Sequence, residues 1–125
     1  MSRRPPSGDA KGRRAERRAE LWLRLKGYRI LARRFRSGQG EVDLIAKRGG
    51  VIAFIEVKFR ASADAALESV GARQQKRILA AASSFGAQHP ALAGMTLRFD
   101  IMIVTKRLLP HHLLNAWSAS AQNIW

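Results

Sequence analysis

Four charged residues near the middle of the chain have types and spacing that could hold a metal ion. Three of the nine acidic residues, Glu41, Asp43 and Glu56, fall within residues 41–56, and Lys58 follows two positions later. Oxygen ligands of this kind favour a hard divalent cation such as Mg²⁺ or Mn²⁺. The chain contains no cysteine, which excludes disulfides, thiolate zinc sites and a cysteine nucleophile.

A β-hairpin is expected to position these residues. Two apolar-rich runs, 41–46 and 51–59, flank the turn-forming sequence Lys47-Arg48-Gly49-Gly50. Because side chains alternate along a strand, a turn with an even number of residues puts all four charged side chains on one face of the sheet. Carboxylates opposed across two strands repel each other, so Lys58, a proton or a divalent cation must compensate them. A set of structural ion pairs is the alternative to a metal site.

The remaining segments predict a single α/β domain over residues 10–125, preceded by a flexible basic tail over residues 1–9. The order of elements, α-β-β-β-α-β-α, favours one mixed central β-sheet flanked by helices. The three histidines lie at expected turns and lack helical spacing, so they receive no role. Outside the hairpin, the expected elements are a helix over 10–26, a strand over 28–35, a loop with some helix over 61–71, a helix over 73–86, a strand over 95–104 and a short helix within 111–125.

The charge of the chain indicates a polyanionic partner. Its net charge is +14, from 23 Lys and Arg against 9 Asp and Glu, and residues 1–36 carry 13 of these basic residues with only three acidic ones. Nucleic acid is the most frequent partner of so basic a domain, with an anionic membrane surface as the alternative. No apolar run approaches the ~20 residues of a membrane span, and no secretory signal is present. We therefore expect no membrane insertion and a cytoplasmic protein, associated with the nucleoid if it binds DNA.

Three blocks of the sequence resemble a known family. Residues 40–46 (GEVDLIA), 54–60 (FIEVKFR) and 98–100 (RFD) are similar to the YraN-like family of predicted endonucleases. That family is similar to archaeal Holliday-junction resolvases within the restriction-endonuclease-like superfamily. The resemblance runs from about Gly12 to Trp117 and implies a restriction-endonuclease-like fold. It also implies Mg²⁺- or Mn²⁺-dependent hydrolysis of DNA phosphodiester bonds, with branched or damaged DNA in repair or recombination as substrates.

The resemblance also implies roles for single residues. Asp43 and Glu56 match the metal-binding carboxylates, and Lys58 matches the catalytic lysine. The Val57 carbonyl and Glu16, on the first helix, complete the implied metal ligands. Further residues expected at the active site are Glu41 and Gln75, and those expected to bind nucleic acid are Arg13, Arg14, Arg17, Arg18, Arg33, Arg34 and Arg60.

Other functions stay open on the sequence alone. The first is a catalytically silent nucleic-acid-binding module whose acidic cluster is structural, and the second is an adaptor for a protein partner. Binding of Mn²⁺ or Mg²⁺ through Asp43 and Glu56 discriminates a nuclease from either of them. Because resolvase-like relatives act as dimers, a homodimer is a further expectation from the resemblance.

Overall fold

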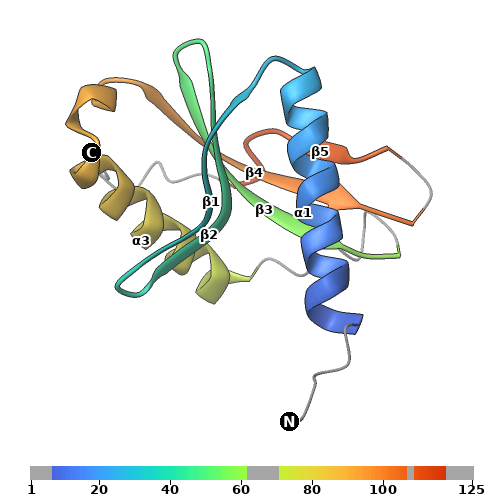
Figure 1. Cartoon of the computed structure of the whole chain (residues 1–125). Helices are drawn as coiled ribbons and strands as arrows, with labels where there is room; N and C mark the ends of the chain where they lie inside the picture. The colour runs from blue at the N-terminus through green and yellow to red at the C-terminus, as the bar shows by residue number, and fades with distance from the viewer. Residues whose placement is uncertain (1–6, 62–70, 107–108, 118–125) are drawn as a thin grey trace, which may run out of the picture.

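The expected hairpin forms the centre of a five-stranded mixed sheet. The computed structural model describes residues 7–61, 71–106 and 109–117. The sheet has the order β1-β2-β3-β4-β5, in which β3 and β4 are parallel and the other neighbouring pairs are antiparallel (Figure 1). The strands are β1 (Arg29–Ser37), β2 (Gly40–Arg48), β3 (Val51–Phe59), β4 (Thr96–Val104) and β5 (His111–Leu113).

Two helices bury the two faces of this sheet. On β3, Ala53 and Ile55 pack with α1 (Ser7–Leu25), while the alternating residues Ile52 and Phe54 pack with α3 (Ala72–Gln88). This follows from the period of two along a strand. A short 3₁₀ helix, η1 (Pro90–Leu92), then leads into β4. Sheet and helices together confirm the expected α/β class.

A close helix–sheet contact fixes the start of β2. A β-carbon placed on Gly40 would overlap the backbone of Ala80 and Ala81 in α3. Glycine therefore allows α3 to approach the strand that carries Asp43. This close contact also holds β2 against α3, with which it shares a hydrophobic cluster.

Two boundaries differ from the sequence-based expectation. The first helix begins at Ser7, directly after the helix-breaking pair Pro5-Pro6, so residues 7–9 are helical rather than part of a tail. The expected C-terminal helix is wrong, because His111–Leu113 forms β5 and pairs with Ile101–Ile103 of β4. Pairing satisfies backbone groups along the outer edge of β4, which a helix would leave without partners. Residues 1–6 of the expected tail, most of the loop expected over 61–71 and residues 118–125 lie outside the described part.

No helix among the described residues is long and apolar enough to cross a membrane.

Candidate functional site

Asp43 and Glu56 lie in contact on adjacent strands. The antiparallel register runs from the two-residue turn to the pair Leu44–Ile55, so the next two residues, Asp43 and Glu56, face each other. Their carboxyl groups are hydrogen-bonded, and Glu56 is buried. Lys58 Nζ lies 3.0 Å from Glu56 Oε2, and the Val57 N–H donates to Asp43 Oδ2 at 2.8 Å. The hairpin thus brings these four expected site residues together.

The contact changes the protonation of Asp43. The pKa of Asp43 is raised to about 8, mainly by burial and also by the negative charge of Glu56 and the hydrogen bond between the two side chains. The Val57 N–H and the Lys58 charge act in the opposite direction. At neutral pH, the carboxyl pair therefore shares one proton, which reduces the repulsion between the two carboxylates.

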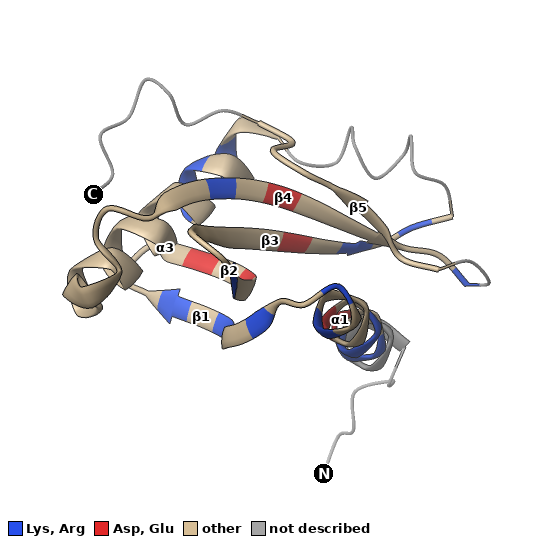
Figure 2. Ribbon diagram, turned by 90° about the horizontal axis from the view of Figure 1, so that it is seen from above, with Lys and Arg blue, Asp and Glu red and all other residues tan. Residues whose placement is uncertain are grey.

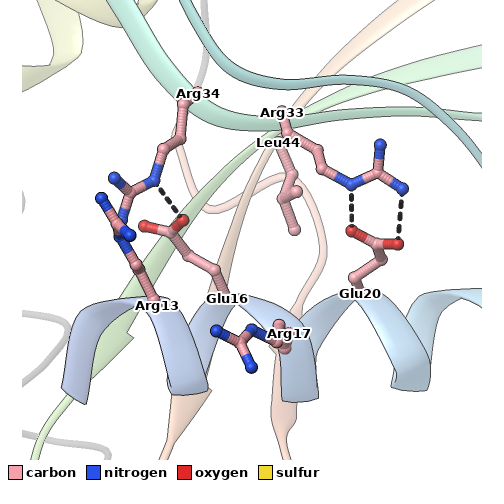
Figure 3. A pocket seen from close by; sticks show the side chains of 7 residues that line it. All are labelled: Arg13, Glu16, Arg17, Glu20, Arg33, Arg34 and Leu44. Carbon is pink, nitrogen blue, oxygen red and sulfur yellow. Dashed lines mark hydrogen bonds and ion pairs between the residues drawn. The ribbon is translucent and has the colours of Figure 1, made fainter. Parts of the chain in front are cut away.

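A pocket of about 330 Å³ opens between α1 and β1 (Figure 3). Arg34 Nε donates to Glu16 Oε1 at 2.8 Å, and Arg33 Nε and Nη2 donate to the two oxygens of Glu20 at 2.6 and 2.8 Å. Burial raises the pKa of Glu16, the Arg34 hydrogen bond lowers it, and the charge of Asp43 raises it further. Glu16 therefore lies within the field of the carboxyl pair. The pocket is lined by Arg13, Glu16, Arg17, Glu20, Arg33, Arg34 and Leu44.

The three carboxylates do not form one metal-binding group as they stand. Among the described residues, no group of three or more His, Asp or Glu side chains lies close enough to hold an ion. Asp43 and Glu56 make a pair, while Glu16 is engaged by Arg34. The assignment of metal ligands stays a prediction.

The two further active-site candidates lie on the α3 side. Glu41 makes ion pairs with Arg36, at 3.4 Å, and with Arg77 of α3. Gln75 is half-buried near the start of α3, and its N–H donates to the Gly71 carbonyl. Both residues therefore border β2 or its covering helix, and Glu41 is engaged by arginines rather than by Asp43 or Glu56.

The expected nucleic-acid-binding residues gather on α1 and β1. Figure 2 shows basic residues on these two elements and acidic residues on the neighbouring strands β2, β3 and β4. Arg13, Arg14 and Arg17 are exposed on α1, whereas Arg18 Nη1 donates to the Thr105 carbonyl at 2.7 Å. Arg18 thus ties α1 to the end of β4. Arg60, exposed after β3, donates to the Phe59 carbonyl at 2.9 Å.

Sequence reasoning missed a buried polar network around Asp100. This carboxylate is fully buried and accepts hydrogen bonds from Arg98, from His112 Nε2 at 2.8 Å and from the Asn115 N–H at 2.9 Å. Burial opposes the ionised form, but these donors hold the pKa of Asp100 below its usual value. The available signal was the Arg98-Phe99-Asp100 block, an acid inside an apolar strand.

The network continues to the C-terminal end of α1. Lys26 Nζ lies 2.8 Å from His112 Nδ1, and Tyr28 hydroxyl contacts Arg98. Because an ammonium group can only donate, His112 accepts at Nδ1 and donates from Nε2 to Asp100. Side chains from β4, β5 and the segment after α1 are therefore held together by one buried carboxylate.

The chain is similar to proteins of one family. A family model described as "Uncharacterised protein family UPF0102" matches residues 15–104. A UPF0102 protein of Paramagnetospirillum magneticum is 47% identical over 126 residues, which cover 94% of this chain and 98% of that protein. A UPF0102 protein of Rhodopseudomonas palustris is 52% identical over 109 residues, covering 87% and 84% respectively. The matched region includes the carboxyl pair, Lys58 and Asp100.

Proposed function

This chain belongs to the uncharacterised protein family UPF0102. We propose, from the geometry of the site, that it is a metal-dependent endonuclease that hydrolyses DNA phosphodiester bonds. The observation that carries the proposal is the contact between Asp43 and Glu56, with Lys58 on Glu56. Opposed carboxylates destabilise a strand pair unless positive charge lies between them. A site that keeps this pair buried is suited to a cation.

The donor set fits Mg²⁺ or Mn²⁺. Asp43 and Glu56 offer hard carboxylate oxygens, and the elevated pKa of Asp43 reflects an anionic site that is left with a proton in the absence of a metal. Asp43, Glu56 and the Val57 carbonyl would hold the ion, with Glu16 as the further ligand. Such an ion, when bound, lowers the pKa of water and stabilises negative charge on phosphate.

The remaining groups have roles that follow from their positions. Lys58 carries its charge beside the carboxyl pair, where it can orient a water molecule or stabilise a nonbridging phosphate oxygen. The exposed arginines of α1 and β1 would hold the DNA backbone next to the site. Metal-dependent DNA cleavage would thereby account for both the Asp43–Glu56 pair and the basic surface around it.

Cleavage and metal binding test this function together. Wild type should cut members of a panel of branched, nicked, linear and single-stranded DNAs in Mn²⁺, and Glu56→Gln should neither cut them nor bind Mn²⁺. Glu20→Gln is the matched control, because it removes a carboxylate whose partners are Arg33 and Arg24. A wild-type protein that neither binds Mn²⁺ nor cuts any DNA would reject the nuclease in favour of a nucleic-acid-binding module.

Basic residues on α1 favour nucleic-acid binding under either function. Replacing Arg13, Arg14 and Arg17 by Gln should weaken DNA binding and make its salt dependence shallower. The log–log slope should fall by about 0.9 for each phosphate that the variant no longer neutralises. Titrations at several salt concentrations measure this slope.

The control for this prediction lies on the other helix. Arg73 and Lys76 are exposed on α3, and their replacement by Gln should leave the slope close to that of wild type. If the α1 variant keeps the wild-type slope, the exposed face of α1 does not contact DNA.

A further inference from the structure

Arg33 and Arg34 depart from the geometry of a regular strand. Consecutive strand residues point to opposite faces of a sheet. Both of these arginines nevertheless reach α1, where Arg33 binds Glu20 and Arg34 binds Glu16 (Figure 3). Arg34 has φ +47°, in the left-handed region that residues other than glycine rarely adopt. This backbone conformation breaks the alternation between the two side chains and is a source of local strain.

The ion pairs of Arg33 and Arg34 do not explain this strain. The side chains of Arg33 and Arg34 are 58% and 45% exposed, and exposed pairs add little to stability. Backbone strain of this kind is found where a site requires it. The position of Arg34 is therefore better explained by binding than by folding.

The two glutamates differ in their surroundings. Hydrogen bonds from Arg33 hold the pKa of Glu20 below its usual value, as expected for a surface pair. The pKa of Glu16 is raised by burial and by the charge of Asp43, despite its bond to Arg34. Leu44, next to Asp43 in the chain, lines the same pocket as Glu16. The charge of Asp43 thus acts on Glu16 as well as on Glu56, and Arg34 holds Glu16 in an ion pair at 2.8 Å.

Positive charge converges at this end of the pocket. In Figure 3, the side chains of Arg13 and Arg34 both extend toward the carboxylate of Glu16, and the charge of Arg13 acts on it. Two guanidinium groups around one carboxylate leave an excess of positive charge. A phosphate can accept charge-assisted hydrogen bonds from both arginines.

We propose that the α1–β1 pocket binds a backbone phosphate of the nucleic acid on Arg13 and Arg34, and that this phosphate displaces Glu16 toward Asp43 and Glu56. The proposal rests on the proposed function, since the carboxyl pair is taken to hold a divalent ion. Glu16 becomes available to that ion only when nucleic acid occupies the pocket. Metal and nucleic acid then bind cooperatively, and each raises the affinity of the other.

Removal of Arg34 should mimic the phosphate. In nucleic-acid-free protein, Arg34→Ala should bind Mn²⁺ about fivefold or more tightly than wild type, a factor at the low end of couplings between sites. Arg33→Ala is the matched control, because it removes the same charge one position away and leaves the Arg34–Glu16 pair in place. Glu16→Gln combined with Arg34→Ala should abolish the gain. Arg34→Gly, which also relieves the left-handed backbone, repeats the measurement if the alanine variant is unstable.

The outcomes separate this proposal from the function on which it rests. Equal gains in Arg33→Ala and Arg34→Ala, or a gain that persists without Glu16, would overturn the displacement of Glu16 while leaving the metal site intact. A wild-type protein that binds no Mn²⁺ would instead overturn the metal site and, with it, the release of Glu16 to that site.

Phosphate binding has its own test, without metal. In EDTA, Glu16→Gln should tighten binding of a short DNA duplex severalfold, because phosphate no longer competes with a carboxylate for Arg34. The gain should disappear in the Arg34→Ala background. Any change in DNA affinity caused by Glu20→Gln should be the same with and without Arg34, since the partners of Glu20 are Arg33 and Arg24. A Glu16→Gln gain of the same size with and without Arg34 would reject the pocket as a phosphate site.

Discussion

Asp43→Asn should make the metal-free protein more stable at pH 8 while abolishing its Mn²⁺ binding. The folded-state pKa of Asp43 is raised to about 8, mainly by burial and also by Glu56. The stability linked to this proton is complete below the ordinary carboxyl pKa near 4 and is lost as the pH rises through about 8. Wild type in EDTA should therefore melt at lower temperatures as the pH rises from 5 to 9, and Asp43→Asn should flatten this dependence.

Thermal melts across this pH range, with EDTA or Mg²⁺, provide the measurement. A gain of ~1 kcal/mol at pH 8 corresponds to about 4 °C in a domain of this size. Mg²⁺ should stabilise wild type and leave Asp43→Asn unchanged. Glu41→Gln is the control, because it removes a carboxylate that is paired with two arginines and should give no gain. If Asp43→Asn melts well below wild type and Mg²⁺ shifts neither protein, the carboxyl pair is structural.

Asp100→Asn should have the opposite effect and lower the free energy of unfolding by about 3 kcal/mol or more. Asp100 is fully buried, and the change removes the negative charge that compensates the guanidinium of Arg98. Loss of one partner of a buried ion pair typically costs ~3–5 kcal/mol because the other charge stays buried. The same substitution, Asp to Asn, is thus expected to change stability in opposite directions at two positions of one sheet.

Urea unfolding of Asp43→Asn, Asp100→Asn, Arg98→Met and the double variant Arg98→Met/Asp100→Asn measures the contribution of the network to stability. The double variant should lose less stability than the sum of its two single changes, because no partly buried guanidinium is then left without a counterion. Mn²⁺ affinity of the folded Asp100→Asn protein should match that of wild type. Stability within ~0.5 kcal/mol of wild type would show that the network contributes little to the fold.

The hairpin and its carboxyl pair could be predicted because they depend on local rules. Gly49-Gly50 favours a tight turn, and the period of two then determines that Asp43 and Glu56 face each other. By contrast, the apolar residues Leu21 and Leu25 of α1 do not join the buried stripe of the helix, since they are 60% and 72% exposed. The helix contacts the sheet through a narrow stripe of buried residues, Ala15, Ala19 and Leu23. The width of this stripe depends on the curvature of the sheet, which is built from strands far apart in the sequence.

The interactions that sequence patterns did not indicate join residues far apart in the chain. His112 meets Lys26 across 86 positions, and no periodicity in either segment indicates the other. A short helix was expected within residues 111–125, but His111–Leu113 instead pairs with the open edge of β4 as a strand. Likewise, the pairing of Glu16 with Arg34 depends on a left-handed residue inside a strand, which alternation along the sequence does not reveal.

The position of β1 at the edge of the sheet bears on self-association. An edge strand offers unpaired backbone groups to which another chain can add, the first step of many aggregates. Four arginines lie along β1, and its register shifts between Ile30 and Ala32. Together with the left-handed Arg34, these features make the edge charged and irregular, so that two copies repel each other there. The arginines that we propose to bind nucleic acid would thereby also keep this edge of the sheet from growing into a fibre.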